Sequence, residues 1–395
     1  MQRAIKIRLI PTPEQEILFR KSCGVARWAY NFYIAEKERV YREWKENNSK
    51  PKFISEQDVR KYINNVLKPT EEYKWLKEVG SNVMKQAVKD ADIAYQRFFK
   101  HLADRPKFKK KDKCKLSFYV NYESLVRTQN GFRGEKIGFV KTSKPLPKLN
   151  KEQKYTNPRI TSDGKYWYLS VGIQIDKPKD IKLSDKSLGI DLGIKELAVC
   201  SNGKFYHNIN KTKTVKNLKK RLRRAERSLS RMLIGNTDHY EPTPKSQKPV
   251  YKRLLNECPN IQRQKKKISL LHKRINDIRH NYIHQTTREI VKTKPSQIVM
   301  EDLNIKGLMK NKHLVRYIQE NYWYEFKRQI KYKSEEYGIK LIEVDRFYPS
   351  SKTCSCCGNV KKELPLKVRT YRCEECGLVI DRDYNASINL SNYKE

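Results

Sequence analysis

The sequence predicts a multidomain α+β protein, and three observations lead to this prediction. A chain of 395 residues has room for two or three domains at roughly 150 residues each. Segments with the alternating polarity of β-strands occur on both sides of a long block with helical periodicity. Five of the nine cysteines crowd into residues 354–376, which indicates a small metal-binding module near the C-terminal end.

The composition is strongly basic, with 86 Lys and Arg against 44 Asp and Glu and a formal net charge of +42. Such an excess repels itself in a compact fold unless a polyanion neutralises it, so nucleic acid is the leading partner. No apolar run approaches the ~18 residues of a membrane span, which argues against a membrane protein. The first ten residues lack the features of a signal peptide, so we expect a cytoplasmic protein associated with DNA.

The order of the elements follows from local patterns. Apolar residues alternate with basic ones over residues 5–9, which predicts a strand. Thr12 and Gln15 then form a capping pattern around Pro13, and a helical block is expected over residues 12–104. Residues 111–180 have strand patterns with a hairpin at Asp163-Gly164, and we expect a β domain there that the first strand completes.

Two basic segments are candidates for contact with phosphate groups. Residues 105–115 contain seven basic residues and one acid, and a solvated linker is an equally reasonable interpretation of them. Residues 211–232 contain ten Lys or Arg and one Glu around an apolar stripe with a seven-residue repeat. A matching stripe over residues 268–282 predicts a helical pair, with a loop-rich connection over residues 233–262. The basic remainder of the first helix favours a phosphate-facing surface.

Four cysteines have the spacing of a structural zinc site. Cys354-x-x-Cys357 and Cys373-x-x-Cys376 are separated by fifteen residues, and a glycine follows each pair. Two such knuckles place four thiolates around a tetrahedral ion, and glycine permits the tight turn beneath each pair. Four cysteine ligands leave no open coordination position, so this zinc is expected to be structural. We interpret Cys356 as a bystander thiol, with exchange of ligands as the minor alternative.

Three short acidic segments stand out in this basic chain. Asp191 and Glu301 follow short apolar strand segments, and Asp381 and Asp383 precede a short helical pattern. Any one of these acids is most simply a surface residue at a strand end or a helix N-cap. Together they fit two-metal phosphodiester hydrolysis, in which several carboxylates converge on two hard cations about 4 Å apart. Strand ends around one sheet provide that convergence.

These residues carry a resemblance to a known family. Together they resemble TnpB, the OrfB-type, transposon-encoded RNA-guided endonucleases related to the compact type V CRISPR nucleases. The resemblance covers nearly the whole chain and is weakest over residues 45–75 and 233–262. The specific segments are Gly189–Glu196, Val299–Asn304, Ser350–Gly358, Cys373–Gly377 and Asp381–Ala386, and the suggestive ones are Thr12–Gln15, Ala26–Asn31 and Arg105–Lys111.

The resemblance implies an architecture. A wedge-like β barrel is interrupted by a helical recognition domain and followed by an RNase H-like (RuvC) α/β nuclease domain that carries a zinc ribbon. The expected boundaries are residues 1–11 and 111–181 for the wedge-like β domain, 12–110 for the helical recognition domain, 182–350 and 379–395 for the RuvC-like nuclease domain, and 351–378 for the zinc ribbon.

The resemblance also implies the chemistry. Asp191, Glu301 and Asp383 match the catalytic triad of RuvC-type nucleases and are expected to bind catalytic Mg²⁺, with two ions in the two-metal scheme. Asp381 is the rival for the third position, and Asp383 is preferred because the family's acid lies two residues before an asparagine. Asp302 is the rival for the second position. It directly follows Glu301, and successive strand residues face opposite sides, so both are not expected to face the metals.

RNA binding is expected to involve the β domain and the two basic segments, because Lys and Arg recognise structured RNA through charge and shape. Similarity to relatives implies that residues 81–86 and 118–122 read a short DNA motif beside the target. The equal alternative is that Val83 and Met84 belong to a core-packed helix with Asn82 near its cap. The nucleic-acid-binding residues expected are Asn82, Lys85, Gln86, Lys109, Lys110, Lys111, Tyr119, Asn121, Lys219, Lys220, Arg221, Arg223 and Arg224.

The favoured function is Mg²⁺-dependent cleavage of target double-stranded DNA, directed by a guide RNA derived from the transposon end. No membrane and no obligate protein partner is inferred. A nuclease-inactive RNA-guided repressor is one alternative, but it would be expected to lose triad acids. A zinc-ribbon RNA-binding or transcription protein leaves the acids unexplained. A strand-transferring transposase, which uses a DNA 3′-hydroxyl in place of water, is not excluded.

Overall fold

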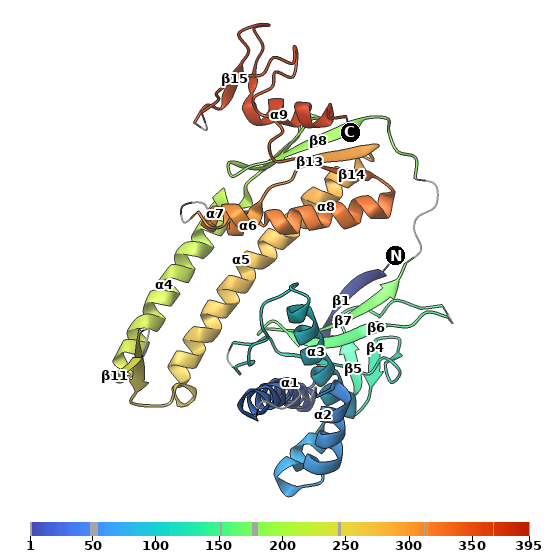
Figure 1. Ribbon diagram of the computed structural model, residues 1–395, viewed down its shortest axis with the longest axis vertical. Coiled ribbons are helices and arrows are strands. Elements are labelled where there is room, and N and C mark those ends of the chain that lie inside the picture. The colour runs from blue at the N-terminus through green and yellow to red at the C-terminus, as the bar shows by residue number, and fades with distance from the viewer. Residues whose placement is uncertain are drawn as a thin grey trace. The chain divides into compact units, whose positions relative to one another are not determined.

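The computed structural model describes residues 2–47, 54–111, 113–150, 152–175, 181–243, 246–311, 313, 315–365 and 367–394. The chain divides into two compact units, Met1–Asp176 and Lys177–Glu395 (Figure 1). The expected boundary between residues 181 and 182 lies beside residues 176–180, which are outside the described residues. Within the described ranges, none of the helices combines the length and the apolar character needed to cross a membrane.

The described part of the first unit contains three α-helices in the segment predicted to be helical. α1 begins with the expected capping box, because the Thr12 N–H donates to Gln15 Oε1 (3.1 Å) and the Gln15 N–H donates to Thr12 Oγ1 (3.3 Å). α3 packs against α1. The elements are α1 (Pro13–Asn47), α2 (Glu56–Tyr62), a π-helical turn (Ile63–Leu67), a 3₁₀ segment (Glu71–Glu78) and α3 (Ser81–Phe99).

The strands of the first unit form one seven-stranded sheet in the order β2-β6-β7-β1-β5-β4-β3. Residues 2–9 of β1 pair antiparallel with β7, so the first strand lies inside the sheet as expected. The strands are β1 (Gln2–Ile10), β2 (Ser117–Tyr119), β3 (Val126–Arg127), β4 (Gly131–Gly134), β5 (Gly138–Thr142), β6 (Thr156–Ser162) and β7 (Trp167–Gln174).

The expected β barrel is wrong for the described residues, because no sheet closes on itself. The edge strands β2 and β3 contain only three and two residues and do not pair with each other. The buried face of the sheet instead shares one core with the helices, and the Phe19 ring of α1 lies 5.2 Å from the Trp167 ring of β7. The helical insert therefore covers the apolar face that the opposite wall of a barrel would otherwise cover.

The second unit is built on a five-stranded mixed sheet in the order β10-β9-β8-β13-β14. β8, β13 and β14 are parallel, whereas β9 and β10 run antiparallel to their neighbours. Gly203, with φ of +81°, turns the chain between β9 and β10. The strands are β8 (Ser187–Leu192), β9 (Glu196–Cys200), β10 (Phe205–His207), β13 (Gln297–Glu301) and β14 (Lys340–Val344).

Helices cover both faces of this sheet. Successive side chains of a strand point to opposite faces, so neighbouring residues of β13 enter different cores. Ile298 and Met300 of β13 join a core with α5 and α8, whereas Val299 joins a second core with Leu390 of α9. The helices are α4 (Lys213–Gly235), α5 (Pro259–Lys292), α6 (Ile305–Leu308), α7 (Val315–Asn321), α8 (Trp323–Tyr337) and α9 (Arg382–Ser391), with 3₁₀ turns at Ile209–Lys211 and Leu255–Glu257.

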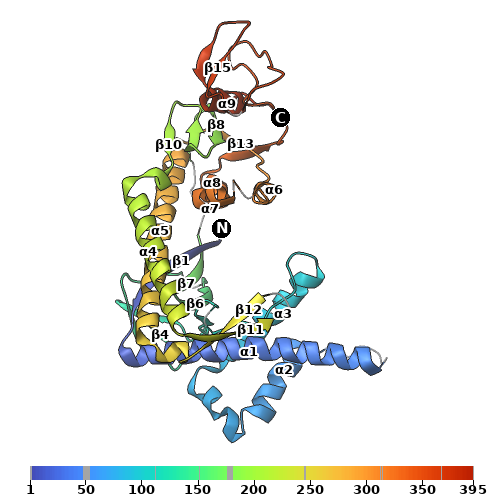
Figure 2. The ribbon, with the colours of Figure 1, turned by 90° about the vertical axis from the view of Figure 1, so that its left-hand side faces the viewer.

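α4 and α5 form the helical pair predicted from their apolar stripes and lie side by side (Figure 2). The connection between them is not simply loop-rich, because β11 (Thr237–Thr243) and β12 (Ser246–Tyr251) pair as an antiparallel ribbon. Pro242 lies in β11 and Pro249 in β12, although proline within a segment usually argues against a strand. A two-stranded ribbon tolerates proline because each strand has one edge that needs no N–H donor.

Candidate active site and metal centre

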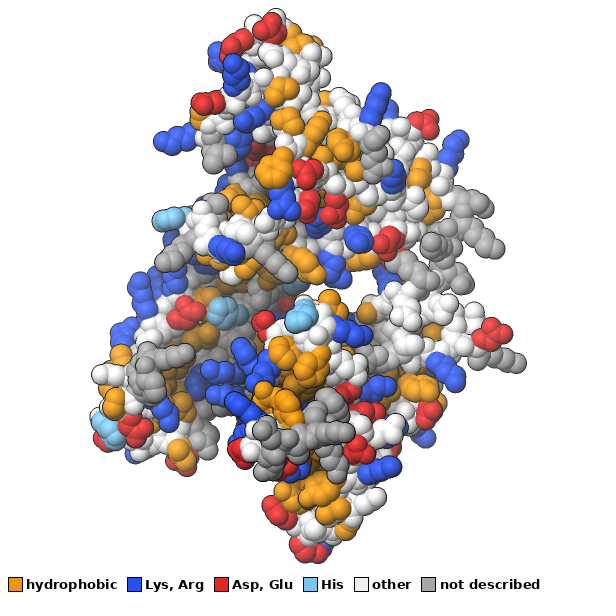
Figure 3. Space-filling view, viewed as in Figure 1, with side chains coloured by type: hydrophobic (Ala, Val, Ile, Leu, Met, Phe, Trp, Pro, Cys, Tyr) orange, Lys and Arg blue, Asp and Glu red, His pale blue; other side chains and the backbone are white. Residues whose placement is uncertain are grey.

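Asp191 and Glu301 lie at the carboxyl ends of the neighbouring parallel strands β8 and β13. Ile190 is the register partner of Met300, so each acid directly follows a paired residue. On the face shown in Figure 3, acidic side chains gather around the end of β13. The carboxyl edge of parallel strands is where open α/β sheets bind their ligands. The two acids therefore share the edge at which a ligand site is expected.

Asp383 reaches this edge from the first turn of α9. The helix crosses β8 at Gly189, where an added Cβ would meet the Ser387 carbonyl oxygen at 2.0 Å and the Ser391 nitrogen at 2.5 Å. A residue with a side chain would push α9 away from the sheet. Sequence reasoning used Gly189 only as part of a motif and missed this role, which is to bring Asp383 to Asp191.

Asp381 and Asp383 have different tasks. The Oδ1 atom of Asp381 accepts the N–H groups of Asp383 (3.0 Å) and Tyr384 (3.1 Å), so Asp381 is the N-cap of α9. Asp383 is buried, and its carboxylate lies 3.1 Å from Arg382 and 3.7 Å from Arg369. This geometry favours Asp383 over Asp381 as the acid of the site.

Asp302 is turned toward cations of the protein itself. Its carboxylate lies 3.1 Å from the Lys327 amine and 3.5 Å from the Arg346 guanidinium. Glu301, one residue earlier, instead accepts a hydrogen bond from the Ser350 hydroxyl. The two neighbouring acids therefore have separate surroundings, as the alternation of a strand requires.

The carboxylate of Asp191 is in an unfavourable position for a charge. The residue is partly exposed, but its carboxylate is surrounded by protein atoms, and this burial raises its pKa well above the usual range. Glu301 and Asp383 raise the pKa further through repulsion. Carboxylates that the fold holds together against their repulsion fit hard cations with oxygen ligands.

The three carboxylates are not already arranged as a set of metal ligands. Among the described residues, only the four cysteines bring three or more ligand atoms within 4.8 Å of one another. Asp383 directs its oxygens to Arg382 and Arg369. Binding of cations between the three carboxylates would therefore require Asp383 to turn from these arginines.

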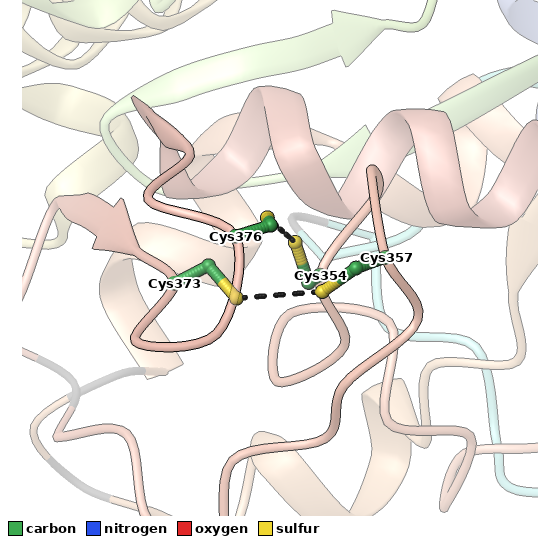
Figure 4. A group of neighbouring side chains, drawn as sticks. All are labelled: Cys354, Cys357, Cys373 and Cys376. Atoms are coloured by element: carbon green, nitrogen blue, oxygen red, sulfur yellow. Dashed lines mark hydrogen bonds between the residues drawn. The ribbon is translucent and has the colours of Figure 1, made fainter.

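The four predicted cysteines converge as a metal site requires (Figure 4). The Sγ atoms of Cys354 and Cys376 lie 3.5 Å apart, as do those of Cys357 and Cys373. Zinc–sulfur bonds of ~2.3 Å in a tetrahedron separate the sulfurs by ~3.8 Å, so the group fits Zn²⁺. The fifth cysteine of the segment, Cys356, is exposed and lies outside the group, as expected of a bystander.

The backbone around these cysteines is built for thiolates. Gly358 and Gly377 follow the two pairs with φ of +77° and +74°, which glycine adopts without strain. Burial raises the pKa of Cys354, but hydrogen bonds from the N–H groups of Cys357 and Cys356 outweigh it and lower the pKa to about 7. The strands β15 (Thr370–Arg372) and β16 (Val379–Asp381) pair beside the second knuckle.

Two buried asparagines tie the cysteine segment to α9. Asn385 Nδ2 donates to the Thr353 carbonyl (2.7 Å), and its Oδ1 accepts the Ser355 N–H (3.0 Å). Asn389 Nδ2 donates to the carbonyls of Ser350 and Thr353 (2.7 Å each). Sequence reasoning treated Asn385 only as a reference position. The cysteine segment thus supports the helix that carries Asp383.

In the first unit, the two segments expected to read a DNA motif lie together. Asn82, Tyr119 and Asn121 line one small cavity between α3 and β2. Gly80, not Asn82, is the N-cap of α3, and Asn82 Nδ2 donates to Glu135 Oε2 (3.2 Å). The core-packed alternative holds for the neighbouring Val83 and Met84, which are buried.

Some of the other residues expected to contact nucleic acid are exposed, and others have partners within the protein. Lys85, Lys110 and Lys111 in the first unit are exposed, as are Lys220, Arg221, Arg223 and Arg224 on α4. Gln86 Nε2 donates to Asp90 Oδ1 (3.0 Å), and the Lys109 amine lies 3.5 Å from the centroid of the Tyr30 ring. Lys219 pairs with Glu320 (2.6 Å) between α4 and α7, so its amine has an internal partner.

Three family models match the chain. The Helix-turn-helix domain HTH_OrfB_IS605 matches residues 1–46. OrfB_IS605, described as "Probable transposase", matches residues 170–312. The Cas12f1-like TNB domain matches residues 323–390, which include the four cysteines and Asp383.

Similar proteins extend over nearly the whole chain. Two are called "Putative RNA-guided DNA endonuclease": one from Streptomyces pristinaespiralis is 28% identical over 99% of this chain and 89% of its own. The other, InsQ of Escherichia coli (strain K12), is 27% identical over 98% of this chain and 91% of its own. "TnpB-like protein L770" of Acanthamoeba polyphaga mimivirus is 23% identical over 98% of this chain and 72% of its own.

One solved structure shares the fold over its whole length. The "Cryo-EM structure of the Cas12f1-sgRNA-target DNA complex" contains a chain that aligns with a TM-score of 0.56 and 14% identity. The alignment covers 99% of both chains. This similarity shows that the chain shares its fold with the aligned chain of that complex.

Proposed function

Because the chain carries the OrfB_IS605 domains and is related over nearly its whole length to TnpB-like proteins, we propose that it is a transposon-encoded, RNA-guided DNA endonuclease. It cleaves target DNA beside a short flanking motif. The observation that carries this proposal is the meeting of Asp191, Glu301 and Asp383 at one sheet edge, where burial and the neighbouring acids raise the pKa of Asp191.

The proposed architecture keeps the expected boundaries. Residues 182–350 and 379–395 form the RuvC-like nuclease domain, and residues 351–378 form a zinc ribbon between β14 and β16. Residues 1–11 and 111–181 form the wedge-like domain, as an open sheet, around the recognition helices of residues 12–110. The mixed sheet with helices on both faces supports the first assignment, and the four converging cysteines support the second.

The three acids would hold catalytic Mg²⁺, for which carboxylate oxygens are the preferred protein ligands. When bound there, Mg²⁺ supplies activation of water and stabilisation of the departing 3′-oxygen, which leaves a 5′-phosphate end. Ser350 fixes the carboxylate of Glu301 by hydrogen bonding, and Gly189 sets the distance between α9 and β8. Arg382 and Arg369 pair with Asp383 in the structure, and when Asp383 turns to a cation their guanidinium groups would be available to the phosphate of the substrate.

One assay separates this function from its alternatives. Labelled duplex DNA is incubated with Mg²⁺ and protein, with and without the RNA that co-purifies. RNA-dependent cutting supports the endonuclease, whereas RNA-dependent binding without cutting supports a repressor. Joining of DNA ends supports a strand-transferring transposase. This alternative agrees with the description "Probable transposase" of the OrfB_IS605 model. RNA binding without any action on DNA supports a zinc-ribbon RNA-binding protein.

We expect the protein to co-purify with a discrete RNA from the transposon end, bound in part by the exposed basic residues of α4. The affinity should fall by about 10³-fold or more between 50 and 200 mM salt, because phosphate contacts release counterions. Joint replacement of Arg221, Arg223 and Arg224 by alanine should reduce the salt dependence measured by filter binding. Lys204→Ala, which removes an exposed lysine paired with Glu289, is the matched control. Active preparations without any defined RNA would contradict this prediction.

Lys85→Ala is expected to weaken target cleavage by about tenfold without altering RNA retention. Lys85 is exposed on α3, three residues after Asn82, which lines the cavity, and one lost contact to a base or phosphate costs roughly this factor. Cleavage of a library of flanking sequences measures the effect. Lys89→Ala, one turn further along the same helix, is the control. Unchanged motif preference in single alanine variants at Asn82, Lys85, Gln86, Tyr119 and Asn121 would reject the assignment.

A further inference from the structure

The loop of residues 345–350, which follows β14, exposes an aromatic ring. Phe347 is 86% exposed, more than any other large hydrophobic side chain in the described part of the chain. Single exposed hydrophobic residues are common on protein surfaces, so exposure alone does not indicate a function. The position of this ring relative to the acidic site is the informative observation.

Both ends of the loop adjoin Glu301 of the neighbouring strand β13. Val344, the last residue of β14, is the register partner of Glu301. Ser350, at the other end of the loop, donates its hydroxyl to the Glu301 carboxylate. Phe347 lies three residues from each of these two positions, and three residues span at most about 11 Å. The backbone of residue 347 therefore lies within about 11 Å of both residues that adjoin Glu301, which places Phe347 on the Glu301 side of the acidic site.

Neighbouring contacts fix the loop and leave the ring outside. Asp345 accepts the Phe347 N–H through Oδ1 (2.8 Å) and the Tyr348 N–H through its carbonyl (3.0 Å). Tyr348 turns inward, where its ring lies 5.3 Å from that of Tyr393 and its hydroxyl donates to the Asn389 carbonyl (3.3 Å). Because the backbone is already ordered, a ligand that covers Phe347 has little loop entropy to overcome.

We propose that Phe347 is a stacking site for a nucleobase of single-stranded DNA next to the scissile phosphate. This inference rests on the proposed nuclease function. DNA whose phosphate lies at Glu301 has bases within reach of a ring on the Glu301 side of the site. Aromatic stacking accepts any base, which suits an enzyme whose sequence choice comes from a guide RNA. Bases in a duplex already stack on each other, so the ring selects unpaired DNA.

The test compares three substitutions in the full-length protein bound to its RNA. Phe347→Ala and Phe347→Leu should each lower the single-turnover cleavage rate of guide-matched DNA by about tenfold, the effect of one lost base stack. Phe347→Trp should keep the rate near that of the unmodified protein, because it restores the aromatic face. Tyr240→Ala, which removes a 52% exposed ring on β11, is the matched control and should change nothing.

A binding readout separates this site from the proposed function. In the Asp191→Ala background, 2-aminopurine placed beside the cleavage position should lose fluorescence on binding when residue 347 is Phe or Trp, and should keep it when the residue is Ala or Leu. Equal rates for Phe and Leu would overturn the stacking site in favour of a plain apolar contact. Unchanged rate and quenching in Phe347→Ala, with an active parent protein, would also overturn it. A parent protein that cleaves no guide-matched DNA would defeat the proposed function itself.

Discussion

Replacing Asp191 or Glu301 by alanine should abolish cleavage of guide-matched DNA, with a loss of at least about 10³-fold. Each substitution removes carboxylate oxygens from the site at the carboxyl edge of β8 and β13, where the developing charge of the reaction must be balanced. The measurement is cleavage of a labelled duplex by each variant bound to its RNA. EDTA should reproduce the loss, and Mn²⁺ should replace Mg²⁺ because it accepts the same oxygen ligands.

DNA binding in the same variants distinguishes loss of chemistry from loss of structure. RNA-guided binding should persist, since the affinity comes from base pairing and from basic surfaces. Asp302→Ala is the matched control, because this acid is adjacent to Glu301 but pairs with Lys327 and Arg346. It should retain most of the cleavage activity. Robust cutting by Asp191→Ala would refute the site, and loss of binding together with cutting would mean that the acids are structural.

Thermal stability gives a second sign of a functional acid. Burial and the neighbouring Glu301 and Asp383 raise the pKa of Asp191, so its negative charge opposes folding when no cation is bound. Asp191→Asn removes that charge with little change in shape. Its melting temperature in EDTA should therefore equal or exceed that of the parent protein. A clear decrease would indicate that the carboxylate makes stabilising contacts, as a structural acid does.

The positions of the acids were readable from the sequence because strand periodicity is a local property. Apolar runs before Asp191 and Glu301 predicted buried strands, and parallel β8 and β13 do end at or one residue after these acids. Likewise, the knuckle spacing of the cysteines determines which thiols can meet. The role of Gly189 was not readable in the same way. It depends on the crossing of α9 over β8, which joins residues almost two hundred positions apart.

Side-chain partners across the fold explain the remaining differences. Lys219 occurs in a run of basic residues that predicts phosphate contact. Its amine instead forms an ion pair with Glu320, about a hundred positions later in the chain. The β barrel was expected from resemblance, whereas closure depends on what covers the apolar face of the sheet. Here α1 and α3 cover it, and short edge strands such as β3 leave the sheet open. Neither the ion pair of Lys219 nor the open sheet could be predicted from local sequence periodicity.

Cys373→Ser is expected to release zinc and to unfold the ribbon of residues 351–378. Apart from its cysteine cluster, this segment has a small core around Tyr371, so metal binding must supply most of its folding free energy. Structural zinc contributes on the order of 10 kcal/mol or more in small domains of this kind. Elemental analysis should find about one zinc per chain in the parent protein and far less in the variant. Limited proteolysis should then cut the variant within the ribbon.

Loss of the ribbon should also lower DNA cleavage strongly, although no cysteine lies among the proposed catalytic acids. Asn385 and Asn389 join α9 to the backbone of Ser350, Thr353 and Ser355, so an unfolded ribbon leaves the helix of Asp383 without these contacts. Cys356→Ser is the matched control. Its thiol is exposed and outside the sulfur group, and serine keeps the backbone N–H that Cys354 uses. This variant should bind zinc and cleave DNA normally. A folded, active parent protein with well under one zinc per chain would refute the metal site, and full activity of zinc-free Cys373→Ser would show that α9 does not depend on the ribbon.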